Sequence, residues 1–259
     1  MASVLIPSYG RQESLEACLR SLNEQTVKPF EIIIEGKKGP LSEIRNQIAS
    51  RSSGDILCFI DDDVECNANW LASILHTFRG DGRIAGVSGP SVIRQAYRQN
   101  RDFFRFRTLR KIHDFMFLGR QRNMPGHITK AGAWTPGATE ETCTYEGEVQ
   151  FLEACNMSFR KEAFEEVGGF DENYLGIGDW SEPDLAFRVR RAGHKLWFAR
   201  DALVYHNPSR GGAFRKRAGD SHNRPANYER FSRAWVKPCF RHSLYKLFLK
   251  SYYAIKALE

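Results

Sequence analysis

The chain has 259 residues, of which 42% are hydrophobic, enough to bury one large core or one core with an attached subdomain. Its longest apolar runs, such as residues 56–60, span only a few residues, which excludes a membrane-spanning helix of about 20 residues. The formal net charge of +7 and the pI near 9.1 favour anionic partners, a class that includes nucleic acids, lipid headgroups and nucleotide phosphates.

Apolar runs and helical patterns alternate over the first 90 residues. Four runs read as buried strands, at residues 4–6, 32–34, 56–60 and 84–87. Three patterns predict amphipathic helices, over residues 15–22, after a capping Ser42, and over residues 70–78. Strands that are apolar on both faces are typical of a parallel sheet covered by helices on both sides, so we expect an open α/β sheet.

The second part of the chain is less regular. Between about Pro90 and Glu148 glycine, proline, threonine and basic residues dominate, and we expect loops there. Strand and helix patterns then return, at residues 151–159, 161–167, 183–192, 196–198 and 203–205. Basic residues alternate with aromatic ones in two stretches, at residues 94–122 and 230–256.

Polar and charged residues follow the predicted strands. They are Pro7, Tyr9 and Arg11 after the first strand, Glu35 after the second, and Asp61, Asp62 and Asp63 after the third. In open α/β sheets, ligands bind at the carboxyl ends of the strands, so these residues are expected to line one binding site.

Three consecutive carboxylates at the end of a buried strand repel one another unless a cation compensates them. Mg²⁺ and Mn²⁺ are commonly held by one or two carboxylates together with phosphate oxygens. We therefore expect Asp61 and Asp63 to hold a divalent metal that clamps a diphosphate. The alternative is a solvated acidic turn that caps the helix beginning near Asn67.

Six runs, in order and at a characteristic spacing, resemble the family 2 glycosyltransferases of the GT-A fold. The resemblance extends over about two thirds of the chain, and the runs that carry it are VLIPSYGR at 4–11, EIII at 31–34, EIRNQIASRSSGDILCFIDDDVE at 43–65, ACNMSFRKEAFEEVGGFDENY at 154–174, SEPDLAFRVRRAGHKL at 181–196 and ALVYH at 202–206.

The resemblance implies a Rossmann-like, mostly parallel sheet flanked by helices, with a smaller acceptor-side subdomain and a C-terminal helical tail. The expected parts are a nucleotide-sugar-binding half at 1–90, an acceptor-binding and catalytic half at 91–218, and the tail at 219–259. The implied enzyme moves a sugar from a nucleotide-diphosphate donor to a hydroxyl of a glycan or a lipid-linked saccharide. It does so by direct displacement with inversion at the anomeric carbon, using Mg²⁺ or Mn²⁺.

The resemblance also implies roles for single residues on the donor side. Glu35 is expected at the nucleotide base or ribose, although the family usually has an aspartate pair and a glycine-serine turn where this chain has Glu35 followed by Gly36. Arg45 is the expected partner of a donor phosphate or of the aspartates. His206, at the end of ALVYH, is expected to complete the metal site or to touch the diphosphate.

Glu182 is the expected catalytic base, which takes the proton from the acceptor hydroxyl. It occupies the position where the family has the aspartate of a Glu-Asp pair. Asp179 and Asp184 are reserve candidates, because a loop shift of a few residues would exchange them. In the alternative reading, Ser181, Glu182 and Asp184 only cap the helix and complement its dipole.

Two other functions fit parts of the pattern. A nucleotidyltransferase also joins an α/β nucleotide domain to metal-binding aspartates, but it normally has a glycine-rich phosphate loop where this chain offers only Gly10. A nucleic-acid-binding protein would use the basic and aromatic stretches to stack bases, but no recognised binding module accompanies them, so no nucleic-acid partner is expected.

The start of the chain and its cysteines favour the cytoplasm. Met1 leads directly into a strand pattern without a signal peptide, and the six cysteines lack the short paired spacings of zinc or redox sites. The basic, aromatic tail is expected to make a peripheral contact with the inner face of the membrane, where lipid-linked acceptors lie. The alternative for the tail is a helix docked on the domain.

Overall fold

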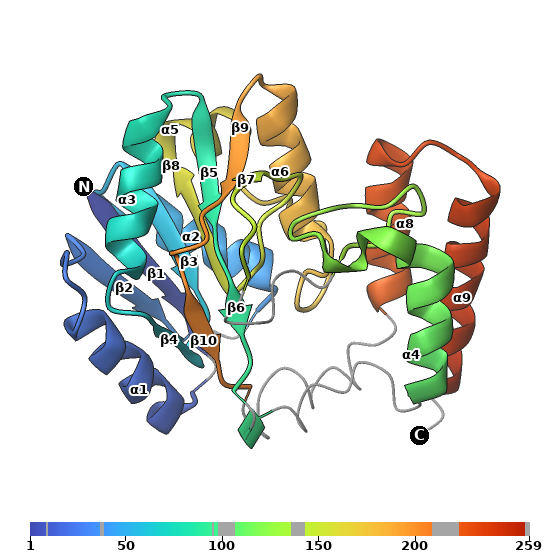
Figure 1. Cartoon of the computed structure of the whole chain (residues 1–259), viewed down its shortest axis with the longest axis horizontal. Coiled ribbons are helices and arrows are strands. Elements are labelled where there is room, and N and C mark those ends of the chain that lie inside the picture. Colours follow the sequence, from blue (N-terminus) through green and yellow to red (C-terminus); the bar gives the residue numbers. More distant parts are fainter. Residues whose placement is uncertain are drawn as a thin grey trace.

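A seven-stranded sheet forms the centre of the molecule, in the order β2-β1-β3-β8-β5-β9-β7 (Figure 1). The computed structural model describes residues 1–8, 10–36, 39–94, 96–97, 107–135, 143–208 and 223–256. The strands are β1 (Ala2–Pro7), β2 (Glu31–Glu35), β3 (Ile56–Ile60), β5 (Ile84–Ser88), β7 (Gly147–Glu148), β8 (Asn156–Arg160) and β9 (Lys195–Phe198). Five of them share one direction, and β7 and β8 run the other way.

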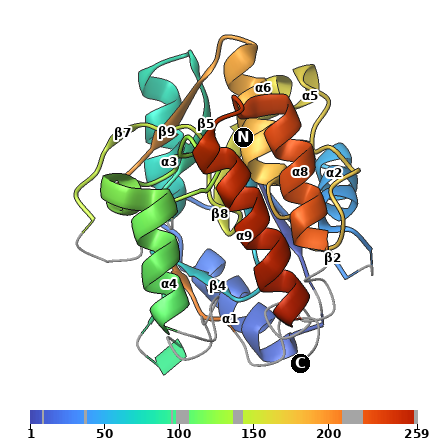
Figure 2. The same ribbon diagram turned by 90° about the vertical axis from the view of Figure 1, so that its right-hand side faces the viewer.

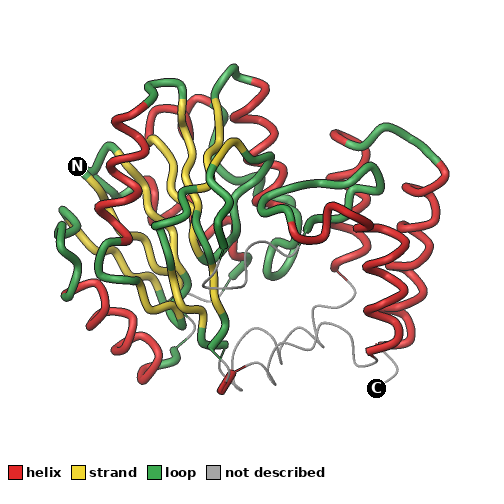
Figure 3. Tube along the Cα trace, in the orientation of Figure 1, coloured by secondary structure: helices red, strands yellow, loops and turns green. Residues whose placement is uncertain are grey.

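Helices cover both faces of this sheet, as the continuous apolar strands predict (Figure 3). In β1, Val4 and Ile6 face the core shared with α1 and α3, whereas Leu5 faces the core shared with α2, α5 and α6. These helices are α1 (Gln12–Asn23), α2 (Leu41–Ser50), α3 (Trp70–Gly80), α5 (Lys161–Glu166) and α6 (Ser181–Arg191). The mostly parallel α/β architecture expected from the sequence is confirmed.

Two local expectations are wrong. β2 is not a buried strand: it lies at the edge of the sheet, with Ile32 and Ile34 38% and 40% exposed, because an edge strand has a neighbour on one side only. Ser42 does not cap α2, since the helix begins at Leu41 after Pro40 and the Ser42 side chain makes no capping hydrogen bond. Proline pre-set for the helical φ takes over the start of the helix.

A small second sheet places the segment that follows β3 beside a strand from much later in the chain. It has the order β4-β10-β6, with β4 (Val64–Cys66), β6 (Ser91–Val92) and β10 (Val204–His206). β10 pairs antiparallel with β4, which sets His206 opposite Val64. The segment between β5 and β6 passes very close to the chain just before β10. This close approach requires a glycine, because a Cβ at Gly89 would lie 2.2 Å from the carbonyl oxygen of Ala202.

A group of helices packs beside the sheet, at the right of Figure 1 and in front in Figure 2. It contains α4 (Arg107–His113), α8 (Asn223–Trp235) and α9 (Phe240–Lys256), and α4 continues into a π-helical turn at Asp114–Leu118 and a 3-10 turn at Gly119–Asn123. The loops and irregular structure expected between residues 90 and 148 therefore also include a helix, α4, that the sequence did not predict. Contacts with residues distant in sequence stabilise these short helices. For example, the ring centroids of Phe117 and Tyr245 lie 4.8 Å apart.

Most of the aromatic residues of the tail point into this helical group, although Phe240 is 81% exposed. Tyr245, Leu249, Tyr252 and Tyr253 of α9 are buried in one cluster with Phe231 of α8. The expected membrane contact is therefore not supported through these side chains, and the docked-helix alternative describes α9. None of the helices in the described ranges is both long and apolar enough to span a bilayer.

Asn156, at the start of β8, links three elements and yields a test of the fold. Its buried side chain accepts a hydrogen bond from Trp70 Nε1 at 2.9 Å and donates one to the Ala202 carbonyl at 2.9 Å. Asn156→Ala leaves both partners buried and unsatisfied, so the free energy of unfolding should fall by about 2–5 kcal/mol in a urea titration. The exposed Asn123→Ala should change it by less than about 0.5 kcal/mol. Equal midpoints for the two variants would contradict this account.

Candidate active site

The three aspartates after β3 lie in three different environments. The Asp61 side chain is 28% exposed, whereas those of Asp62 and Asp63 are 0% and 4% exposed. Asp62 accepts a hydrogen bond from the Ser8 hydroxyl at 2.9 Å and contacts the Arg11 guanidinium. Arg11 also contacts Asp63, so the residue that follows β1 neutralises the two inner carboxylates.

Asp61, Asp63 and His206 converge from two strands and offer three ligand atoms within 4.8 Å of one another. Asp63 Oδ1 lies 3.3 Å from His206 Nε2, and this buried oxygen accepts no hydrogen bond in the structure. A buried oxygen without a donor is a free ligand position. Two carboxylates and an imidazole suit Mn²⁺ or Mg²⁺, so the residues present fit a divalent cation.

The electrostatics of this cluster also favour a cation. Burial and the neighbouring Asp63 raise the pKa of Asp61 above its ordinary value, in spite of the opposing charges of Arg45 and His206. Burial would raise the pKa of Asp63 too, but His206 and Arg11 lower it overall. Burial would lower the pKa of His206, yet the Cys155 sulfur and the Asp63 carboxylate beside the ring raise it.

Arg45 connects this cluster to Glu182. Its side chain, on α2, is 1% exposed, and Nη1 donates a hydrogen bond of 2.6 Å to Glu182 Oε1. Nη2 lies 4.0 Å from Asp61 Oδ1. Burial raises the pKa of Glu182, although Arg45 counteracts the shift. One buried guanidinium therefore stands between the carboxylate that starts α6 and the carboxylate that ends β3.

The two reserve carboxylates have other partners. Both oxygens of Asp179 accept hydrogen bonds from Arg224, at 2.6 and 2.9 Å. Those of Asp184 accept from Arg188 Nε at 2.9 Å and from Trp235 Nε1 at 2.7 Å. These are structural contacts, but they are not the capping contacts of the alternative reading, since no side chain in the described part of the chain caps the start of α6.

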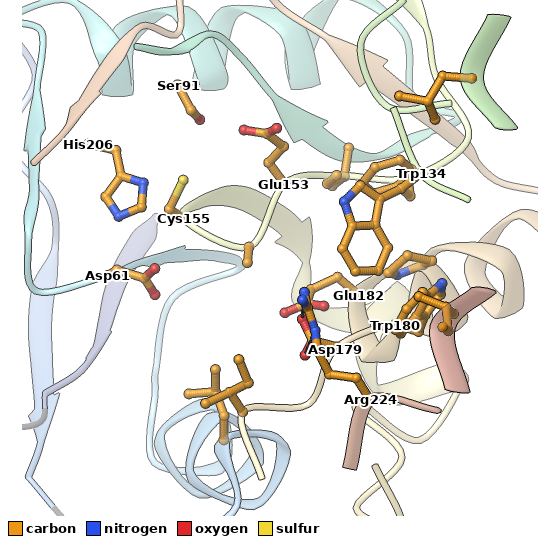
Figure 4. A pocket seen from close by; sticks show the side chains of 18 of the residues that line it. Asp61, Ser91, Trp134, Glu153, Cys155, Asp179, Trp180, Glu182, His206 and Arg224 are labelled. Carbon is orange, nitrogen blue, oxygen red and sulfur yellow. Dashed lines mark hydrogen bonds and ion pairs between the residues drawn. The ribbon is translucent and has the colours of Figure 1, made fainter. Parts of the chain in front are cut away.

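A cavity of about 320 Å³ opens in front of these groups. Asp61, Cys155 and His206 lie on one side of it, and Trp134, Trp180 and Glu182 lie on the other (Figure 4). Its outer wall comes from the helical group and is aromatic and apolar, with Leu118, Tyr245, Phe248, Leu249, Tyr252 and Tyr253. The cavity thus has a charged end at the strand termini and an aromatic end at α9.

Most of the residues expected at the site line this cavity, namely Pro7, Arg11, Arg45, Asp61, Glu182 and His206. Asp62 does not reach it, because its carboxylate is fully buried against Arg11. Asp63 does not line it either and faces His206 and Arg11. Glu35 lies at the same edge of the sheet, paired with Pro7 in register, but its carboxylate accepts a hydrogen bond from Arg51 at 2.8 Å and does not line the cavity. Tyr9 lies outside the described residues.

The cavity is also lined by residues that the sequence did not single out, among them Trp134, Glu153, Cys155 and Arg224. Glu153 and Cys155 lie within or next to the run that carries the family resemblance, and their proximity to it is a signal that was available. Trp134 and Arg224 lie in irregular and tail regions, where no motif or periodicity marks them.

The comparisons with known proteins agree with this architecture. Residues 37–168, about half of the chain, match the family described as glycosyl transferase family 2. A glucosyl-dolichyl phosphate glucuronosyltransferase of Haloferax volcanii is 23% identical over 79% of this chain and 68% of its own length. The amylovoran biosynthesis glycosyltransferase AmsB of Erwinia amylovora is 25% identical over 83% of this chain and 72% of its own.

Among solved structures, a mannosyltransferase of Pyrobaculum calidifontis in complex with GDP-Man and Mn²⁺ superposes with a TM-score of 0.57. The superposition covers 99% of this chain and 72% of that one at 15% identity, a level that shows a shared GT-A fold. The family match extends from α2 through β3 and its aspartates to α5, and so includes Arg45 and the Asp61–Asp63 run. The chain therefore belongs to glycosyl transferase family 2 and is an enzyme of glycosyl transfer.

Proposed function

We propose that the protein transfers a sugar from a nucleoside diphosphate donor to a hydroxyl of a saccharide or lipid-linked saccharide, by direct displacement with inversion. The observation that carries the proposal is the convergence of Asp61, Asp63 and His206 beside a cavity that Asp61, His206 and Glu182 line. A displacement in which a diphosphate leaves and a hydroxyl attacks has two requirements: ligands for a cation, and a carboxylate that can act as a base. Both are present here, and Arg45 lies between them.

The donor belongs at the charged end of the cavity. Pro7 and Arg11 lie there at the end of β1, with Glu35 at the adjacent end of β2, so the nucleoside would lie along this edge and its diphosphate would face Asp61 and His206. A divalent cation held by Asp61, Asp63 and His206 would neutralise the charge that develops on the leaving diphosphate. Support comes from the similar mannosyltransferase, whose structure contains GDP-Man and Mn²⁺.

Arg45 and Arg11 supply permanent positive charge beside the same position. Arg45 is nearly inaccessible to water, and its guanidinium approaches both Glu182 and Asp61. A desolvated, fixed cation stabilises developing negative charge more than a solvated one, because it needs no reorganisation during the reaction. Arg11 fixes Asp63 in the orientation that turns its second oxygen to His206.

Glu182 is the proposed base. It takes the proton from the acceptor hydroxyl while the oxygen attacks the anomeric carbon, and the bond from that carbon to the diphosphate breaks on the opposite side. Asp179 and Asp184 suit this role less well, because both oxygens of each accept hydrogen bonds from neighbouring side chains. Glu153 is the rival carboxylate within the cavity and has to be tested beside Glu182.

The acceptor belongs at the aromatic end. Trp134 faces the cavity opposite Asp61, and its ring packs against Trp180 at 4.3 Å between centroids (Figure 4). Flat aromatic faces with Asp179 and Arg224 beside them suit the apolar faces and hydroxyl rims of a saccharide. The name of the haloarchaeal relative, a glucosyl-dolichyl phosphate glucuronosyltransferase, supports a lipid-linked saccharide as one acceptor of this kind.

The reaction is tested by incubating the protein with a panel of nucleotide sugars, saccharide or lipid-linked saccharide acceptors, and Mn²⁺ or Mg²⁺. Release of a nucleoside diphosphate, with an inverted anomeric centre in the glycosylated acceptor, supports the proposal. In a parallel incubation with nucleoside triphosphates and sugar phosphates, release of pyrophosphate would instead show a nucleotidyltransferase.

We expect Mn²⁺ together with the matching nucleoside diphosphate to raise the melting temperature of the wild type, since a ligand of the folded state stabilises it by about 2.7 kcal/mol at one hundred times its dissociation constant. Asp63→Ala and His206→Ala should each lose the metal-dependent part of this shift. The matched control is Asp201→Ala, which removes an exposed carboxylate paired only with the adjacent Arg200. A full metal-dependent shift in both site variants would place the cation elsewhere.

Glu182→Gln should lower kcat by about 10²–10⁴-fold with little change in donor binding, because the amide has the size of the carboxylate but cannot take the proton. Donor binding is followed by calorimetry and turnover by nucleoside diphosphate release. The control is Glu165→Gln, on the exposed side of α5. If Glu153→Gln loses turnover and Glu182→Gln retains it, Glu153 is the base.

The pH dependence of turnover follows from the raised pKa of Glu182. The base acts when deprotonated, so kcat should rise with pH and level off above the ordinary pKa of a glutamate. Arg45 lowers the pKa of Glu182, so Arg45→Met should move this rise to higher pH. A profile whose rise stays in place in Arg45→Met would show that another group titrates.

A further inference from the structure

Helix α8 presents one face to the segment that carries Glu182. The residues of this face recur at the spacing that lines up side chains along one side of a helix: Arg224, Asn227, Tyr228, Phe231 and Trp235. Four of them are buried, and each contacts the chain between residues 131 and 187. The sequence gives this helix no motif, and Arg224 beside the acceptor is the one residue of α8 that the reaction described above uses.

The first contact lies three residues before Glu182. Arg224 binds Asp179 through two parallel hydrogen bonds, the strongest geometry between a guanidinium and a carboxylate. Arg224 also donates to the hydroxyl of Tyr253 on α9, and both residues are buried. One turn along α8, the Asn227 side chain accepts from the Leu175 backbone N–H at 2.9 Å and donates to its carbonyl at 3.0 Å.

The second contact lies two residues after Glu182. Trp235 Nε1 donates to Asp184 Oδ1 at 2.7 Å, and the ring of Phe231 meets that of Phe187 edge to face, with centroids 5.7 Å apart. Helix α8 therefore holds the chain both before and after Glu182. The carboxylate stands between two anchored points.

Trp180, between Asp179 and Glu182, is held in a strained conformation. Its φ of 69° is the left-handed region, which is uncommon for a bulky residue and costs about 1–3 kcal/mol. Its indole N–H donates to the Gly132 carbonyl at 3.2 Å, and its ring lies 5.3 Å from that of Tyr228 on α8. Such a conformation persists only when the surroundings fix it, and α8 supplies part of that support.

We propose that α8 is a clamp that positions the catalytic base, with Arg224 and Trp235 as its positioning residues. The inference rests on the proposed function, in that Glu182 is taken to be the base. The clamp holds residues 175–184 against α8, so that Glu182 faces Arg45 and the acceptor end of the cavity. Arg224 acts through Asp179 and the backbone that follows it, and Trp235 acts through Asp184.

Hydrogen exchange tests the clamp independently of any reaction. In Arg224→Met the amides of residues 175–182 should exchange at least about tenfold faster than in the wild type, because local opening no longer breaks two buried hydrogen bonds. Trp235→Phe keeps an aromatic ring beside Phe187 and should accelerate exchange in residues 184–187. The matched control is Arg233→Met, on the exposed side of the same helix. Unchanged exchange in both variants of the clamp would overturn the inference, whatever the activity.

Kinetics then test whether the clamp serves the base. Arg224→Met should lower kcat for nucleoside diphosphate release by about 10²-fold, the typical effect of a displacement near 1 Å, with the KM of the donor unchanged. Arg224→Lys, which keeps the charge but not the paired geometry, should fall between wild type and Arg224→Met. Faster exchange without a loss of kcat would overturn the positioning role.

The same experiments separate the clamp from the proposed function. A wild type that releases no nucleoside diphosphate from any nucleotide sugar would count against the proposed function, and the exchange rates would still decide whether α8 holds residues 175–184. If Arg224→Met does not fold, Trp235→Phe carries both measurements, because it removes one hydrogen-bond donor and little volume.

Discussion

The repulsion among three consecutive carboxylates at the end of a buried strand is the constraint on which the arrangement of this site depends. Two unit charges about 4 Å apart interact by about 4 kcal/mol at the effective dielectric near a protein surface, so the run from Asp61 to Asp63 would destabilise β3 if it stood alone. Each carboxylate instead meets a cationic group from a different part of the chain: Arg11 after β1, Arg45 on α2 and His206 on β10. The site exists because the fold brings these three groups to one strand end.

That requirement explains features far from the charges. β10 reaches Asp63 because it pairs with β4. The segment that contains Gly89 can lie against the chain before β10 only because Gly89 has no Cβ. Asn156 on β8 links Trp70 of α3 to the Ala202 carbonyl, just before β10, through two buried hydrogen bonds. The small second sheet thus delivers an imidazole to the acidic strand end, and its contribution to packing is secondary to that placement.

The sequence allowed much of this to be predicted. Continuous apolar runs identified β1, β3 and β5, and the aspartates after β3 were expected at the site because parallel strands end at a common edge. Other features depend on packing that no local pattern encodes. Asp61 and Asp62 are adjacent and chemically identical, but in the turn between β3 and β4 the Asp62 side chain points inward to Arg11, so it does not reach the cavity. The helix of Arg107–His113 depends on contacts with α9, and the position of Trp134 in the cavity wall depends on its contact with Trp180. In both cases the partner lies more than 40 residues away in sequence.

The same packing separates the carboxylates near α6 into different chemical roles. Asp179, Glu182 and Asp184 lie within six residues, and the sequence favoured Glu182 as the base while leaving the other two as reserve candidates. In the structure Asp179 and Asp184 are each held by two hydrogen-bond donors, and α8 supplies Arg224 and Trp235 among them. Glu182 faces the cavity with one strong partner, Arg45, and burial raises its pKa. A carboxylate acts as a base only if its lone pairs are available and its pKa is near the working pH. By binding the two flanking aspartates, α8 leaves Glu182 as the carboxylate of this segment that best fits the proposed role of base.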